Sequence, residues 1–332
     1  MDGQQLLSQL QAYISNDVLT LSASNSLNSS SVNTLLSNFF GNTLTVTLSN
    51  APEVNTTYIY FRNCSFNAEA FELYRSQANL LAQLTFEVVS PGDRIELLVE
   101  LTLPDSYTFS DSFETVKELT NNSLNDLKVT EPRLLLNSRN LPEKLDFTAK
   151  LIKNQGLIKP LGWLFEDAIV LRGSIQLTRT EAGNTYPEML LKTTTSKSPP
   201  VMGFEMDVLF QVQSKLITIT NSEDSSNQQV QLVINNTIVA DFITSKFRLP
   251  VVINTRSNQQ SSYHVMLDLQ RPFPVIGKLS DLSDLTGGTN PSESLSVDTP
   301  VGALSFQHVS FTLDAVHKTI SDYTIRIYLG TN

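Results

Sequence analysis

The chain is poor in the residues that usually carry covalent or metal chemistry. Its 332 residues include one cysteine, Cys64, three histidines and one tryptophan. A single cysteine excludes an internal disulfide, so stability has to come from burial, and a reducing compartment fits best. No two histidines have the spacing of a zinc pair, and no Cys-x-x-Cys motif occurs. We therefore expect neither a metal nor a cofactor, and a half-buried thiol is favoured over a nucleophilic Cys64.

Basic charge and long apolar runs are also scarce. Lysine and arginine total 23 against 33 acidic residues, which gives a formal net charge of −10. Without a surplus of cations, nucleic acid and anionic lipid are poor partners. No stretch of about 18 apolar residues and no basic leader are present, so we expect neither a membrane span nor a conventional signal peptide. The expected location is the cytoplasm, or release without such a peptide.

Motifs of common enzyme classes are missing as well. The chain has no Gly-x-Ser-x-Gly elbow, no dinucleotide glycine fingerprint and no phosphate-binding loop. Its acidic clusters, such as Glu223 with Asp224, lack the register of a calcium loop and are better explained as solvated turns. The sequence therefore leans away from an enzyme.

What the chain does contain is apolar residues alternating with polar ones. Leu44–Leu48, Leu84–Val88, Ile95–Leu101 and Tyr323–Ile327 all have the period of two that buries one face of a strand. Short strands joined by polar turns predict an all-β protein built from antiparallel sandwiches or flattened barrels. For Glu69–Leu84 the pattern leaves strand and helix open.

Composition divides the chain into three parts. Apolar spacing predicts a short amphipathic helix within residues 3–20, followed by a Ser- and Asn-rich linker or loose lead-in, so residues 1–37 precede the first domain. Glycines and prolines cluster at 178–203. The predicted β-domains are therefore 38–180 and 181–332. Trp163 and Phe165 are either an apolar plug between them or part of the first core.

A faint repeat suggests that the two domains arose by internal duplication. Each position of the second copy follows its counterpart by 168, for example 272 − 104, and the proline pairs are 28 apart in both (132 − 104 and 300 − 272). The matching positions are Val99, Leu101, Pro104, Leu127, Val129, Pro132 and Leu136 in the first copy, and Leu267, Leu269, Pro272, Leu295, Val297, Pro300 and Leu304 in the second.

The two proline-bounded loops are the candidate binding sites. Loops this long usually bind something or close over a core. Their apolar residues are favoured as caps of each domain, and a binding surface is the alternative. The candidate binding residues are Tyr107, Phe109 and Phe113 in the first loop and Phe273, Ile276 and Leu279 in the second.

Two functions from different classes are compatible with these features. The first is a non-enzymatic structural or interaction protein whose duplicated β-domains dock on a partner, on a second copy or on a carbohydrate. The second is a β-fold with an apolar cavity that carries or cyclises a small lipid or terpenoid-like ligand. The predicted strand at 322–330 favours assembly if it lies at a sheet edge, because it would then offer unpaired backbone groups. The alternative is that its charges, chiefly Arg326, guard the edge against such pairing.

Overall fold

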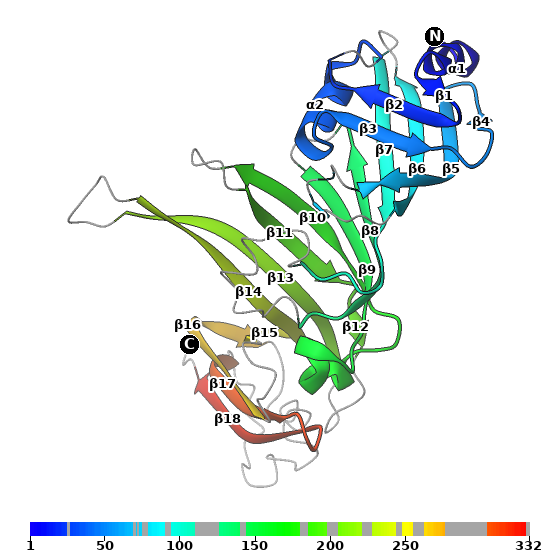
Figure 1. Cartoon of the computed structure of the whole chain (residues 1–332). Helices are drawn as coiled ribbons and strands as arrows, with labels where there is room; N and C mark the ends of the chain where they lie inside the picture. The colour runs from blue at the N-terminus through cyan, green and yellow to red at the C-terminus, as the bar shows by residue number, and fades with distance from the viewer. Residues whose placement is uncertain are drawn as a thin grey trace. The chain divides into compact units, whose positions relative to one another are not determined.

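The computed structural model of the chain is mostly β (Figure 1). It describes all residues except 25–26, 69–70, 72, 75–78, 90–93, 110–125, 140–143, 180–184, 198–204, 221–227, 244–247, 255–261, 276–303 and 330–332. Its helices include α1 (Gly3–Gln11), α2 (Ser30–Phe39) and the 3-10 helix η2 (Gly156–Leu164). Among the described residues, no helix is long and apolar enough to cross a membrane.

Strands make up most of the described chain. In chain order they are β1 (Ile14–Ser15), β2 (Val18–Ser22), β3 (Thr43–Thr47), β4 (Glu53–Val54), β5 (Tyr58–Asn67), β6 (Asn79–Val89), β7 (Arg94–Thr102), β8 (Val129–Asn137), β9 (Lys144–Leu151), β10 (Val170–Arg179), β11 (Thr185–Thr193), β12 (Ser196–Lys197), β13 (Glu205–Thr220), β14 (Gln228–Ile243), β15 (Arg248–Asn254), β16 (Ser262–Val275), β17 (Leu304–Asp314) and β18 (Thr319–Leu329).

Most of these strands form one sheet whose order follows the chain. The order is β1-β2-β3-β5-β6-β7-β8-β9-β10-β11-β13-β14-β15, with β4 paired to β5 and β12 paired to β13, and a second sheet has the order β16-β17-β18. The strand pairs with a described register, such as β6 with β7 and β16 with β17, are antiparallel. The prediction of a mostly β, antiparallel protein is therefore confirmed.

Alternating burial explains why these segments form strands. In β7, Ile95, Leu97, Val99 and Leu101 are all at most 3% exposed, and they form the inward set that the period of two predicts. Close strand packing also depends on Gly173 in β10. A side-chain carbon there would lie 2.0 Å from the carbonyl oxygen of Leu190 in β11, a distance that no larger residue tolerates.

The N-terminal segment differs from its prediction in two respects. The helix predicted within residues 3–20 ends at Gln11, and β1 and β2 occupy the rest. The predicted Ser- and Asn-rich linker contains α2, which begins at the N-cap Ser29. Residues Val32, Leu35, Leu36 and Phe39 of α2 are buried, and their helical spacing was hidden by the polar composition around them.

The chain divides into two compact units whose segments alternate along the sequence. Unit 1 consists of Met1–Leu151, Val170–Leu191 and Gln213–Ile234, and unit 2 of Ile152–Ile169, Lys192–Val212 and Asn235–Asn332. The sheet order continues through 178–203, where β11 lies between β10 and β13 and is not an edge strand. The tandem sandwiches divided near residue 181 are therefore not confirmed and stay a prediction.

The strand registers do not confirm the duplication either. Val99 faces Leu136 across β7 and β8. A copy with the same register would set Leu267 against Leu304, but Leu267 faces Val309 in β17. What the two hairpins share is antiparallel strands joined through one of the long proline-bounded segments.

Candidate functional site

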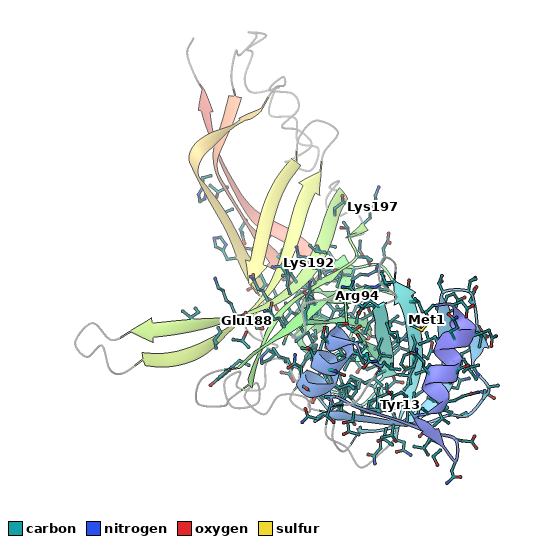
Figure 2. The ribbon with its side chains drawn as sticks, turned by 90° about the horizontal axis from the view of Figure 1, so that it is seen from above. Met1, Tyr13, Arg94, Glu188, Lys192 and Lys197 are labelled. Carbon is teal, nitrogen blue, oxygen red and sulfur yellow. The ribbon has the colours of Figure 1, made fainter. Side chains whose placement is uncertain are left out.

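The described part of unit 1 has a surface groove beside α1. Its volume is about 520 Å³. Apolar lining comes from Leu7, Ile14, Leu48, Ala51, Pro52 and Phe61, and polar lining from Gln11, Asp17, Ser49 and Asn50. In Figure 2, the labels on Met1 and Tyr13 mark the two ends of the helix that forms one wall.

Helix α1 is held in place by its cap and by one glycine. The Asp2 carboxylate accepts a hydrogen bond from the Gln5 backbone N–H at 2.9 Å, and the Gln5 side chain accepts one from the Asp2 N–H, a capping box. Leu6 and Leu10 face the core, which leaves the half-buried Leu7 for the groove. Gly3 donates to the Thr56 carbonyl at 3.0 Å, and a side-chain carbon at Gly3 would lie 1.8 Å from the Asn55 carbonyl oxygen.

A tight turn between β1 and β2 places the one charged lining residue. Asn16 and Asp17 both have left-handed backbone angles, with φ of 51° and 60°, and Ser15 pairs with Val18 across them. This is the arrangement of a two-residue hairpin turn that favours Asn and Asp. The Asp17 carbonyl accepts from the Leu48 N–H at 2.7 Å, which joins the turn to the loop after β3.

The floor of the groove lies where β5 has an irregular register. Phe61 is 1% exposed, and its ring meets that of Phe86 edge-on at 6.0 Å. The register shifts between Phe61 and Cys64, and Asn63 there has a φ of 52°. Cys64 is 1% exposed, and burial raises the pKa of its thiol to about 11, so the thiolate is disfavoured.

Charge in the groove is acidic. Asp17 is exposed and is the charged member of the lining. Arg62, which follows the floor residue Phe61, pairs with Glu53 at 3.0 Å and lies 5.0 Å from the centre of the Tyr60 ring. In the part of the chain that the structure describes, no group of three His, Cys, Asp or Glu side chains could hold a metal ion. The arrangement suits an apolar group that carries a positive charge nearby.

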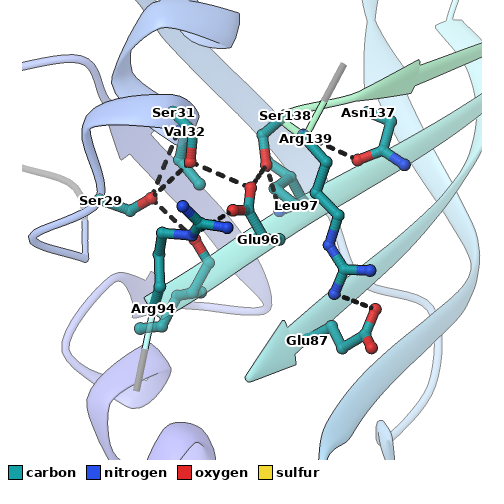
Figure 3. Close-up of polar contacts among 11 residues, drawn as sticks. Ser29, Ser31, Val32, Glu87, Arg94, Glu96, Leu97, Asn137, Ser138 and Arg139 are labelled. Atoms are coloured by element: carbon teal, nitrogen blue, oxygen red, sulfur yellow. Dashed lines mark hydrogen bonds and ion pairs between the residues drawn. The ribbon is translucent and has the colours of Figure 1, made fainter. Parts of the chain in front are cut away.

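A second polar feature of unit 1 is a buried carboxylate at the start of α2 (Figure 3). Glu96 is 3% exposed, accepts from Ser31 Oγ at 3.0 Å and from Ser138 Oγ, and pairs with Arg94 at 2.8 Å. The Ser29 hydroxyl donates to the Ile95 carbonyl at 2.7 Å. A negative charge at a helix N-terminus is favourable. Because its oxygens are already bonded, Glu96 anchors α2 to β7.

The structure brings together the first two candidate binding residues. Tyr107 is 4% and Phe109 1% exposed, with ring centres 5.7 Å apart, and each ring also meets Phe147 of β9. The ends of this segment are tied by a bond from the Leu103 N–H to the Pro132 carbonyl at 2.9 Å. Both side chains face the interior of unit 1, as core residues do.

The other candidate residues are placed only in part. Phe113, Ile276 and Leu279 lie outside the described residues. Phe273 belongs to β16 and pairs with Phe306 of β17, so the strand extends past the expected start of the loop. A binding role for this set stays a prediction.

Trp163 and Phe165 lie in and just after η2. Phe165 is 1% exposed, and its carbonyl accepts from Lys153 Nζ at 2.9 Å. Lys153 also pairs with Asp167 at 2.8 Å, and hydrogen bonding to Lys153 lowers the pKa of that carboxyl. The indole nitrogen of Trp163 is buried and has no partner among the described residues. Their role between domains stays a prediction.

Sequence reasoning missed the groove, although part of its signal was present. Leu7 widens the apolar stripe of α1 beyond the Leu6 and Leu10 needed for a core contact. The loop Leu48–Pro52 and the turn at Asp17 gave no comparable sign, because their meeting depends on strand pairing far along the chain.

Neither protein families, curated proteins nor solved structures gave a match to this chain. Fold and site therefore define a class: a mostly β protein of antiparallel sheets with a small acidic surface groove.

Proposed function

We propose that this chain is a non-enzymatic interaction protein, and that the α1 groove receives an apolar side chain from an extended segment of a protein partner. The observation that carries the proposal is the combination of the half-buried Leu7, Ile14 and Leu48 with a single charge, Asp17. An aliphatic side chain would cover the first three, and a neighbouring Lys or Arg would reach the carboxylate.

Two other occupants are weaker candidates. A volume of about 520 Å³ is within the range of small-molecule sites, so a small apolar ligand is the second candidate. A carbohydrate fits this groove less well, because Phe61, the aromatic residue of its lining, is 1% exposed and offers no ring face for stacking.

The proposal includes the duplicated origin of the two β-regions, 38–180 and 181–332. What supports it is that each long proline-bounded segment connects two antiparallel strands, β7 with β8 and β16 with β17. Docking on a partner is the role we assign to the whole chain.

The experiment is a selection of short random peptides displayed against the immobilised full chain. We expect enriched peptides to combine an aliphatic residue with a nearby Lys or Arg. Asp17→Asn keeps a residue that suits the turn and should weaken binding about three- to tenfold, while Leu7→Ser should weaken it further.

Leu81→Ser is the matched control, because Leu81 is 45% exposed and does not line the groove. Enriched peptides that bind the Leu7 and Asp17 variants as tightly as the original chain would overturn the proposal. Enrichment of purely apolar peptides, with no preference for Lys or Arg, would favour the carrier function.

A further inference from the structure

We propose that the α1 groove also receives the turn between β17 and β18 of a second copy of the chain, and that this self-docking competes with the partner segment. The proposal rests on the groove chemistry of the proposed function. The turn consists of residues 315–318, between Asp314 and Thr319, which are paired across the two strands. The groove belongs to unit 1 and the turn to unit 2.

The turn carries the most exposed large apolar side chain of the part of the chain that the structure describes. This is Val316, which is 66% exposed. The other exposed side chains of this kind are Leu81 at 45%, Leu190 at 40% and Ile217 at 43%. They belong to β6, β11 and β13, each of which has a neighbouring strand on both sides. A side chain in a hairpin turn can enter a groove, whereas those three are flanked by their sheet.

The turn is held in one shape by Asp314. Its carboxylate accepts hydrogen bonds from the backbone N–H groups of Val316 and His317, both at 2.8 Å, and contacts His317 Nδ1 at 2.8 Å. A loop that is fixed before it docks loses less conformational freedom on docking. The same contacts engage Asp314 within the turn.

Groove and turn have complementary chemistry. The groove offers an apolar lining beside the carboxylate of Asp17. The turn offers Val316 with the exposed Lys318 two residues further along. These are the aliphatic and basic groups that the groove is proposed to recognise, and opposite local charges favour one docked orientation over others. A second copy is therefore an occupant that the chain itself supplies.

Docking of this kind joins different surfaces of the two copies. Each copy has one groove and one turn, so a contact between one of each leaves the other groove and the other turn free unless the assembly closes. A partner segment in the groove would remove the site that the turn needs. Self-association and partner binding should therefore exclude each other.

The first test is sedimentation velocity of the full chain over a range of concentrations. We expect association that increases with concentration. Leu7→Ser alters the groove and Val316→Ser alters the turn, so each should raise the dissociation constant by about tenfold or more. An equimolar mixture of the two variants should recover association, because an intact turn then meets an intact groove. Leu81→Ser is the matched control and should associate like the original chain.

The second test is cross-linking between two copies that carry different tags. Ala51 is exposed and lines the groove, so Ala51→Cys in one copy and Val316→Cys in the other should form an intermolecular disulfide under mild oxidation. In the control, Leu81→Cys replaces Val316→Cys. Cys64 is buried, and burial raises the pKa of its thiol to about 11, so it should not compete.

A chain that stays monomeric at the highest concentration would overturn the proposal. So would association that Val316→Ser leaves unchanged, or a mixture of Leu7→Ser and Val316→Ser that does not recover. Peptides that bind the groove of a monomeric chain would refute self-docking and leave the proposed function standing. Self-association that depends on both residues, without enrichment of basic and aliphatic peptides, would do the reverse.

Discussion

Glu96 shows how one buried residue can anchor a helix. Its carboxylate accepts bonds from Ser31 and Ser138 and pairs with Arg94. Removing it leaves the buried Ser138 hydroxyl and the half-buried Ser31 hydroxyl without this acceptor and takes a negative charge from the start of α2. We expect Glu96→Ala to lower the free energy of unfolding by about 2–3 kcal/mol in urea denaturation.

Glu87 provides the matched control on the neighbouring strand. It pairs with Arg139 at 2.9 Å, but both side chains are exposed, at 47% and 39% (Figure 3). Glu87→Ala should cost less than about 1 kcal/mol. Equal losses from Glu87→Ala and Glu96→Ala would contradict an anchoring role for Glu96.

His317 and Asp314 form a titrating pair at the turn between β17 and β18. Their side chains are 2.8 Å apart, and Asp314 also accepts from the His317 backbone N–H at 2.8 Å. The side-chain hydrogen bond to Asp314 raises the pKa of His317 above 6.5, and the same bond lowers the pKa of Asp314 below 3.8.

The sign of each shift fixes the pH range in which the pair stabilises the turn. The stabilisation of the turn by protonated His317 is complete below the unfolded-state pKa of this residue. It is lost as the pH rises through the higher folded-state pKa. The Asp314 contribution is lost as pH falls through its lowered folded pKa. By NMR titration we expect a His317 midpoint above 6.5 that falls toward 6.5 in Asp314→Asn. An unchanged midpoint would show that the pair does not form.

At the scale of elements, α1 depends on its close approach to the loop after β4. A side-chain carbon at Gly3 would lie 1.8 Å from the Asn55 carbonyl oxygen, so Gly3→Ala has to move the helix. Alanine ordinarily stabilises a helix relative to glycine by about 0.5–1 kcal/mol, so here the expected sign is reversed. We expect a loss of about 1–3 kcal/mol, measured by chemical denaturation, and weaker peptide binding.

Gln4→Ala is the control for Gly3→Ala, because Gln4 is the next residue of α1 and is exposed. It should leave stability within about 0.5 kcal/mol. A Gly3→Ala chain as stable as Gln4→Ala would mean that the helix does not sit against Asn55 as described.

Strands could be predicted from the sequence where buried and exposed residues alternate along the segment. The alternation of Ile95–Leu101 identified β7, and the strand and its inward face agree with it. The helix α2 was missed because serine and asparagine dominate its sequence, although Val32, Leu35, Leu36 and Phe39 have helical spacing. What makes that segment a helix is burial against β2, β3 and β7, and such tertiary contacts are not contained in a local pattern.

At the scale of the whole molecule, strand order could not be inferred from composition. Glycines and prolines at 178–203 predicted a single boundary, which stays a prediction: the chain passes between the two units several times, once after Leu191, while the sheet order continues through β11. The groove has the same origin, since α1, β1, β5 and the loop after β3 meet only through the pairing of the strands. Pairing between distant segments is therefore the part of the structure that could not be predicted from the sequence alone.

The most direct test of the account is to locate a bound partner segment. A selected peptide carrying a photoreactive group beside its aliphatic residue would be cross-linked to the full chain, and the modified residues would be identified by mass spectrometry. The account predicts attachment at Leu7, Gln11 or the segment Ser49–Pro52, and its loss with Leu7→Ser. Attachment confined to residues outside the groove, unaffected by Leu7→Ser, would contradict it.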